Sequence, residues 1–300
     1  MISIKSIDIS LGSKIEENDE ISNLVGWSAD EITKKTGIKK RFISLESETA
    51  ESLALDAASK INHDDLLSLD LIISVTNTQQ VDFPSIAHYV HSQLSLKNNV
   101  KCLGINAGCS GFVDAIELVY SLFQSGFASK ALILNADTYS KFTGHERSTR
   151  TLFSDGASAT VIEKDQKGFV IANKIHSSVS GTYEYLTKQK VQDNIMISMN
   201  GPQVLKFAMS TVLKDLLSVI PSEESLLFPH QAGKLVLDLI EKKMPSTVEI
   251  ASNYEKFGNL VSASIPNLIS ENFNMLTKDI IILSGFGVGL SHNCLVLKKV

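Results

Sequence analysis

The sequence predicts an α/β fold built from two similar halves, residues 1–164 and 165–300, that pack against each other in layers. Three observations predict it: short apolar runs rich in Ile and Val, segments of helical periodicity between these runs, and an order of elements that occurs twice. Apolar residues make up 43% of the 300 residues, which is enough for the large core that such layers need.

Ten short apolar runs are predicted to be strands, because aliphatic and β-branched residues dominate them. They cover residues 3–9, 69–75, 101–105, 130–136, 157–163, 169–175, 225–228, 247–251, 280–283 and 293–298. Between them, residues 111–123 and 234–243 are predicted to be helices.

The two halves are predicted to be distant copies of one unit. In residues 104–136 a strand leads to a loop, a helix that begins with small residues, and a second apolar strand; residues 257–283 show the same order. Upstream, strands 71–75 and 226–229 each run into a short polar loop. No Pro-, Gly- or Ser-rich linker separates the halves, so we expect them to pack tightly.

Composition excludes several classes of protein. The net charge of −5 gives no general attraction to nucleic acid, and the apolar runs are too short to span a bilayer. Three cysteines without a Cys-x-x-Cys pair argue against a disulfide framework and an ordinary zinc site, so we expect a cytoplasmic protein without a metal. The basic cluster at residues 34–41 is either a solvated helix end or a contact for phosphate or a carrier protein.

Cys109 is the main candidate nucleophile. It lies between Gly108 and Gly111 at the start of a predicted helix, where unpaired N–H groups and a partial charge of ~0.5 favour a thiolate and lower its pKa. The glycines let a substrate approach the backbone closely. The alternative for any cysteine is a small buried hydrophobe, and we apply that interpretation to Cys102 and Cys294.

His230 and Asn259 are candidates because each follows the end of an apolar segment. His230 ends a predicted strand, and its ordinary pKa of ~6.5 suits proton transfer and hydrogen-bond donation. Asn259, taken alone, is equally well explained as a turn or a helix cap. Like Cys109, both lie between the C-terminal end of a predicted strand and the helix that follows it. Open α/β sheets bind ligands at this end of their strands.

Eight short motifs, in register over nearly the whole chain, resemble those of the β-ketoacyl-acyl-carrier-protein synthase III family of the thiolase-like superfamily. They are TGI at 36–38, FPS at 83–85, CSGF at 109–112, FSDGA at 153–157, MNG at 199–201, PHQA at 229–232, GN at 258–259 and GFGVG at 285–289. The resemblance implies a thiolase-like αβαβα sandwich and an acyltransferase.

The resemblance also implies a role for each candidate residue. Cys109 would take an acyl group from a thioester, and His230 and Asn259 would stabilise the enolate formed when a malonyl thioester loses carbon dioxide. The backbone N–H groups of Cys109 and Val288 would form the oxyanion hole. Acyl-CoA or acyl-carrier-protein thioesters would be the substrates, without a metal or cofactor.

Substrate binding and assembly follow from the same resemblance. Arg147, Lys206 and Lys35 would contact the substrate or an acyl carrier protein. Two copies of the chain would form a symmetric dimer through the strand at residues 101–105, and Phe83 would reach the partner's acyl pocket.

Four positions depart from members of the family that initiate fatty-acid synthesis. Glu31 stands where those members have a Trp that stacks on adenine, Lys35 replaces an Arg, Gly233 replaces an Asn, and Leu235 replaces a further Arg. An acidic residue there would lose stacking and repel phosphate. These changes predict weaker binding of free coenzyme A and a specialised pathway fed by a carrier protein.

Three other functions stay open. The chain order Cys, His, Asn also occurs in papain-like proteases, although their signature around the Cys is missing here. A non-catalytic partner of an active synthase is a second alternative, although such a partner would be expected to lose the nucleophile. The third is acyl transfer to a hydroxyl or an amine, in which His230 would act as the general base.

Overall fold

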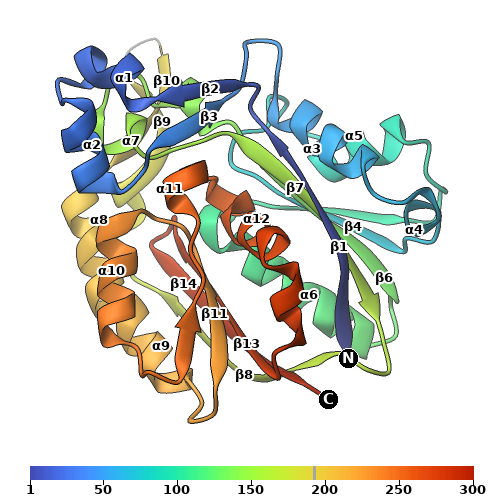
Figure 1. Cartoon of the computed structure of the whole chain (residues 1–300). Coiled ribbons are helices and arrows are strands. Elements are labelled where there is room, and N and C mark those ends of the chain that lie inside the picture. The colour runs from blue at the N-terminus through green and yellow to red at the C-terminus, as the bar shows by residue number, and fades with distance from the viewer. Residues whose placement is uncertain (192–193) are drawn as a thin grey trace.

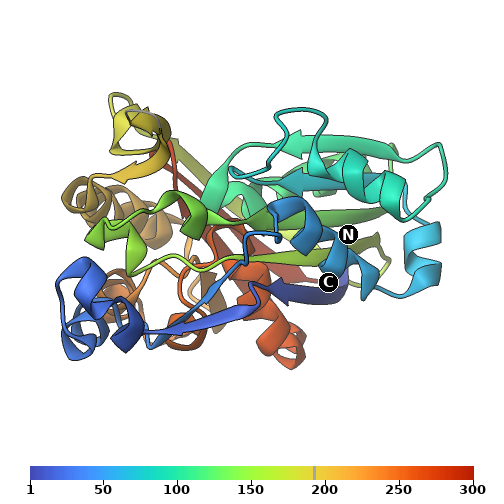
Figure 2. The same ribbon diagram turned by 90° about the horizontal axis from the view of Figure 1, so that it is seen from above.

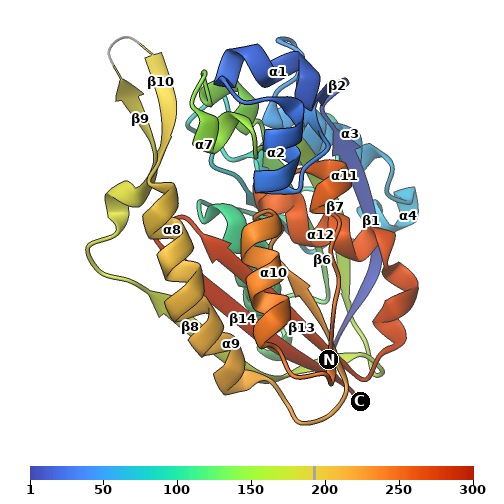
Figure 3. The ribbon, with the colours of Figure 1, turned by 60° about the vertical axis from the view of Figure 1, so that its left-hand side comes forward.

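The computed structural model describes residues 1–191 and 194–300 (Figure 1). Within these ranges no helix combines the length and apolar character required to cross a membrane. The two termini lie close together at one end of the molecule, as the three views agree (Figures 1, 2 and 3).

The N-terminal half contributes five strands to the main sheet. They are β1 (Ile2–Leu11), β4 (Leu71–Val75), β5 (Lys101–Ile105), β6 (Lys130–Asp137) and β7 (Gly156–Lys164). Their order is β5-β4-β6-β7-β1, in which β4 pairs in parallel with β5 and β6, while β7 pairs antiparallel with β6 and β1.

The C-terminal half repeats this arrangement. Its strands are β8 (Phe169–Ser178), β11 (Ser225–Pro229), β12 (Val248–Ile250), β13 (Ile280–Gly287) and β14 (Ser291–Lys299). Their order, β12-β11-β13-β14-β8, has the same sequence of parallel and antiparallel pairs. A single pair, Ile2 with Phe169, joins β1 to β8. All ten predicted strands are present, and the duplicated order is confirmed by the topology.

Helices complete five layers. Two of them, α6 (Gly111–Gln124) and α12 (Ser264–Glu271), lie between the two halves of the sheet and share one core with both (Figure 1). The outer faces are covered in the N-terminal half by α3 (Ala50–Ser59) and α5 (Ile86–Gln93) and in the C-terminal half by α9 (Leu213–Val219) and α10 (Lys234–Lys243). Because α6 is enclosed on both sides, its residues Phe112, Ile116, Val119 and Phe123 are fully buried.

Several further elements gather at the end of the molecule opposite the termini, and we call them the cap (Figures 1 and 3). They are β2 (Lys14–Glu17), α1 (Asn18–Val25), α2 (Ala29–Thr36), β3 (Lys40–Ile43), α7 (Arg147–Arg150), β9 (Leu186–Val191) and β10 (Asn194–Met199). The sequence did not predict these strands, because charged residues interrupt them and no apolar run marks them.

A buried ionic cluster ties the cap together. Glu16 on β2 accepts a bond of 2.5 Å from Arg150 on α7 and lies 3.5 Å from Nε of Arg41 on β3. Burial lowers the pKa of Arg41 to about 10, so the guanidinium stays charged at neutral pH. Removing one member would leave an uncompensated buried charge, which is strongly destabilising. The cluster therefore holds α7, which carries Arg150, against β2.

The remaining helical segments are short. They are α4 (His63–Leu67), α8 (Gly201–Phe207), α11 (Tyr254–Phe257), the 3-10 segments η1 (Gly108–Ser110), η2 (Tyr139–Phe142), η3 (Tyr183–Tyr185), η5 (Val261–Ala263) and η6 (Phe273–Thr277), and the π-helical turn η4 (Ala208–Val212). The π-helical turn joins α8 and α9 into one rod beside β8 (Figure 3). Such turns are frequent near functional sites.

Candidate active site

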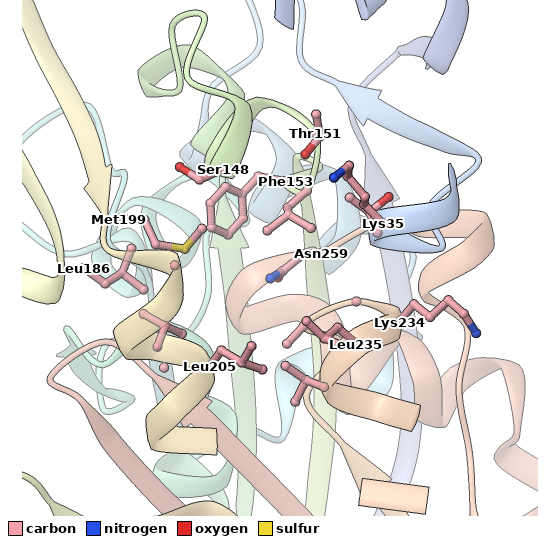
Figure 4. A pocket seen from close by; sticks show the side chains of 18 of the residues that line it. Lys35, Ser148, Thr151, Phe153, Leu186, Met199, Leu205, Lys234, Leu235 and Asn259 are labelled. Carbon is pink, nitrogen blue, oxygen red and sulfur yellow. The ribbon is translucent and has the colours of Figure 1, made fainter. Parts of the chain in front are cut away.

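A cavity of about 400 Å³ opens beneath the cap, and Cys109, His230 and Asn259 all line it. Figure 4 shows Asn259 on its wall. The three residues come from segments far apart in the sequence, as predicted. Most of the remaining lining is apolar: Leu152, Phe153, Leu186, Met199, Val204, Leu205, Leu235, Val236 and Phe286. A cavity with a few polar groups on an apolar wall suits a substrate with a hydrocarbon chain.

Cys109 is held at the start of α6 by a close approach between η1 and the end of β13. An added Cβ on Gly287 would lie 3.0 Å from Cβ and 3.2 Å from Sγ of Cys109, and one on Gly285 would lie 2.8 Å from Cα of Ser110. Gly108, at φ +52°, makes the turn into η1. These glycines are therefore required for the nucleophile to sit against the strand.

Burial raises the pKa of the Cys109 thiol, and the carboxylate of Asp137 adds to the rise. A hydrogen bond from the backbone N–H of Cys109 acts in the opposite direction but is outweighed. The expectation of a lowered pKa is therefore wrong, because the sequence did not show how completely this thiol is enclosed. Neither Cys102 nor Cys294 lines the cavity.

Asp137 joins the two halves directly behind the nucleophile. Its carboxylate accepts hydrogen bonds from Oγ of Ser262 at 2.5 Å and from the backbone N–H of Asn77 at 2.9 Å. Burial raises the pKa of Asp137 to about 6 despite these bonds. Ser262 lies three residues after Asn259, so this bridge also fixes the segment that carries Asn259.

His230 follows the last residue of β11 and is 2% exposed. Its backbone N–H donates to the carbonyl of Ser284 at 2.8 Å, and its ring packs edge-on against Phe286 with centroids 5.4 Å apart. Burial lowers its pKa to about 3, so the imidazole is neutral in the physiological range. Nδ1 has no hydrogen-bond partner among the described residues.

Asn259 is oriented by one hydrogen bond to its side-chain oxygen and by two hydrogen bonds of its backbone. Oδ1 accepts from the backbone N–H of Val261 at 2.9 Å, which turns the NH₂ group toward the cavity (Figure 4). Its backbone exchanges bonds with Leu152 and Ser154. Val261 has φ +53°, an unfavourable conformation for a β-branched residue, so the surrounding packing maintains strain beside Asn259.

The mouth of the cavity carries an aromatic ring between two cations. Lys35 Nζ lies 4.7 Å and Arg147 Cζ 5.5 Å from the ring centroid of Trp27. Arg147 is held there by a hydrogen bond from Nε to the carbonyl of Val25. The sequence analysis did not identify Trp27 as a site residue. It could have been found, because it is the only Trp of the chain and lies four residues before position 31, where other members of the family have a Trp.

Glu31 does not face this mouth. Its carboxylate accepts from the backbone N–H and the hydroxyl of Ser28, forming the capping box of α2, and these bonds lower its pKa. The aromatic ring on this part of the cavity wall is that of Trp27, four residues before Glu31. The other three changed positions, Lys35, Gly233 and Leu235, do line the cavity.

Three of the predicted site residues lie outside the cavity. Phe83 is 83% exposed, and Lys206 is exposed on α8. The Val288 side chain packs against Gly108, where an added Cβ would lie 2.9 Å from Val288 Cγ2. The role predicted for Val288 is that of its backbone N–H, next to Gly287 of the cavity wall. The structure therefore brings together the triad, Lys35 and Arg147.

Comparison with known proteins agrees with this geometry. Residues 103–179 match the model of 3-oxoacyl-(acyl-carrier-protein) synthase III, and residues 218–299 match its C-terminal model. The β-ketoacyl-(acyl-carrier-protein) synthase III of Aquifex aeolicus is 34% identical over 97% of both chains, and that of Clostridium perfringens is 32% identical over 94% of both.

Solved structures give the same result. The crystal structure of 3-oxoacyl-(acyl-carrier-protein) synthase III from Aquifex aeolicus superimposes with a TM-score of 0.88 at 31% identity, covering 99% of this chain and 100% of that one. The thiolase-like layered fold and the resemblance seen in the motifs are confirmed. The chain belongs to the 3-oxoacyl-(acyl-carrier-protein) synthase III family and is an acyltransferase of the condensing type.

Proposed function

We propose that this protein condenses an acyl group with a malonyl thioester in two steps. In the first, Cys109 Sγ bonds to the acyl carbonyl carbon, the donor's C–S bond breaks, and the thiol proton leaves with the released thiol. In the second, the malonyl thioester loses carbon dioxide, the electron pair of the broken C–C bond enters an enolate, and its α-carbon attacks the acyl-enzyme. The C–S bond to Cys109 then breaks, and the thiolate takes up a proton.

The observation that carries this proposal is the convergence of one thiol and two neutral hydrogen-bonding side chains in one apolar cavity. His230 is neutral because burial lowers its pKa to about 3, and Asn259 presents its NH₂ group. Neutral donors stabilise an enolate oxygen without trapping it as an ion pair. The proposed reaction needs no metal or cofactor.

Product analysis tests the proposed reaction. Condensation releases one carbon dioxide for each β-ketoacyl thioester formed, and mass spectrometry identifies that product. Acyl transfer to a hydroxyl or an amine would give an ester or amide without carbon dioxide. Peptide hydrolysis would point to a protease, and no turnover with any acyl donor would point to a non-catalytic partner.

We propose an acyl carrier protein as the partner, in a specialised fatty-acyl or polyketide pathway in the cytoplasm. Lys35, Gly233 and Leu235 support a changed donor because all three line the cavity at positions that differ from the initiating members. Exposed Lys206 and the basic cluster 34–41 offer positive charge to an acidic carrier protein. Glu31 does not support a change of acyl donor, because Trp27 places an aromatic ring on the cavity wall although position 31 has none.

We expect Trp27→Ala to raise KM for an acyl-CoA donor by about 5- to 100-fold, since stacking of a base on an aromatic ring contributes ~1–3 kcal/mol. KM for the same acyl group on a carrier protein should change less, because that donor carries no adenine. Steady-state kinetics with both donors measures the difference. The exposed neighbour Leu24 on α1, changed to Ala, is the matched control. Equal changes for both donors would contradict adenine stacking on Trp27.

We propose that two copies pair through β5. This strand is the last in the sheet order, so one of its edges is unpaired within residues 1–191 and 194–300, and Phe83, in the segment before α5, is 83% exposed. The partner's Phe83 would then close the acyl pocket. Light scattering at micromolar concentration should give the mass of a dimer, and Phe83→Ala should change the preferred acyl length. A stable monomer would contradict the proposal.

A further inference from the structure

Behind the active site, three buried side chains form a hydrogen-bond chain that the proposed reaction does not use. Oγ of Ser284 on β13 lies 3.0 Å from Nε2 of His292 on β14, and Nδ1 of His292 lies 3.0 Å from Oδ2 of Asp215 on α9. Ser284 and His292 are 0% exposed, and Asp215 is 6% exposed. The chain thus connects an outer helix to two central strands.

The chemistry of the end groups fixes the direction of this chain. An ionised carboxylate only accepts hydrogen bonds, so Nδ1 of His292 carries the proton and donates to Asp215. Nε2 is then the acceptor for the Ser284 hydroxyl. Burial lowers the pKa of His292 although Asp215 acts in the opposite direction, which favours the neutral ring that this arrangement requires.

The same order of groups occurs in hydrolases, but Ser284 is not placed to act as a nucleophile. Its side chain is fully enclosed and does not line the active-site cavity. A substrate carbonyl therefore has no route to the hydroxyl. What the chain does reach is His230.

Two routes lead from the chain to His230. The backbone carbonyl of Ser284 accepts the His230 N–H at 2.8 Å. The Phe286 ring packs against both imidazoles, with centroids 6.3 Å from His292 and 5.4 Å from His230. Because Nδ1 of His230 has no partner among the described residues, the orientation of this imidazole depends on its packing against Phe286.

We propose that Asp215, His292 and Ser284 are positioning residues for His230. Hydrogen bonds with Asp215 and Ser284 fix the orientation of the His292 ring. This ring packs against Phe286, and Phe286 in turn orients the His230 imidazole toward the cavity. The proposal rests on the proposed role of His230 in decarboxylation. The chain acts through the Phe286 side chain, whereas Cys109 is held by the backbone of the flanking glycines. We therefore expect the two half-reactions to respond differently to loss of the chain.

Ser284→Ala is the first test. The substitution leaves Nε2 of His292 buried without a donor, which frees the ring to move and displaces Phe286. We expect decarboxylation of a malonyl thioester to slow by about 10- to 100-fold, because small displacements of a catalytic group have effects of this size. Acylation of Cys109, followed by intact mass, should proceed at the wild-type rate, because the variant keeps the glycine contacts that hold Cys109.

Two variants of Asp215 with side chains of nearly the same size are the second test, which applies if Ser284→Ala folds poorly. Asp215→Asn keeps an oxygen that can accept from Nδ1 and should retain most of the decarboxylation rate. Asp215→Leu removes the acceptor and should show the same selective loss as Ser284→Ala. Ser225→Ala is the control, because this buried serine of β11 has a hydroxyl with no partner in the described parts of the chain.

Nitrogen-15 NMR of the histidines gives a readout independent of activity. His292, assigned with a His292→Gln variant, should show protonated Nδ1 and unprotonated Nε2 in the wild type. The opposite tautomer would overturn the inference, as would equal slowing of both half-reactions, or of neither, in Ser284→Ala. A wild type that acylates but releases no carbon dioxide would instead contradict the proposed function of His230, while the tautomer would still test the chain.

Discussion

Cys109→Ala is expected to abolish the acyl-enzyme completely. An acyl thioester donor should add one acyl mass to the wild-type protein and none to the variant, because no other cysteine lines the cavity. The smaller side chain fits the site, since Gly287 approaches Cys109 Cβ without a side chain of its own. Intact mass spectrometry after a short incubation measures the adduct.

The other two cysteines are the controls for this result. Cys102→Ala and Cys294→Ala should acquire the acyl group at the wild-type rate, because Cys294 is buried in the core and Cys102 lies in the strand β5. An adduct that survives in Cys109→Ala and maps to Cys102 would refute the assignment of the nucleophile.

His230→Ala and Asn259→Ala are expected to separate the two half-reactions. Each removes one neutral hydrogen-bonding group from the position of the enolate oxygen, and loss of one such donor slows catalysis by about 10²- to 10³-fold. Acylation should continue in both variants, because the thioester carbonyl in that step is expected to meet the backbone N–H groups of Cys109 and Val288. Carbon dioxide release from a malonyl thioester measures the second step.

His63→Ala on the exposed helix α4 is the control for removal of an imidazole. It should leave both half-reactions unchanged. If His230→Ala instead loses acylation as severely as decarboxylation, His230 acts as a base for Cys109, and the division of labour proposed for the triad is wrong.

The sequence predicted the layers and the convergence of the triad because both depend on local patterns. Ten apolar runs became ten strands, and small residues around Cys109, His230 and Asn259 marked the turns at strand ends. The hairpin strands β2 and β9 escaped prediction because their charged residues resemble loops. The position of β2 is set by tertiary contacts such as the ionic cluster at Glu16.

Electrostatic properties of the site could not be predicted in the same way. The pKa of Cys109 rises because several segments enclose it, and no local motif reports that enclosure. Trp27 reaches the cavity from four residues before position 31, where other members of the family have a Trp. The chain of Asp215, His292 and Ser284 joins residues from three elements, and His292 alone is indistinguishable in sequence from a satisfied core histidine.

The most direct test of the central claim follows the acyl-enzyme through a single turnover. Wild-type protein is first loaded with an acyl thioester, freed of excess donor, and then mixed with a malonyl thioester while intact mass, carbon dioxide and thioester products are recorded. We predict that the acyl mass disappears from Cys109 as equal amounts of carbon dioxide and β-ketoacyl thioester form. An acyl-enzyme that stays intact under these conditions, or that releases the free acid without carbon dioxide, would contradict condensation at this site.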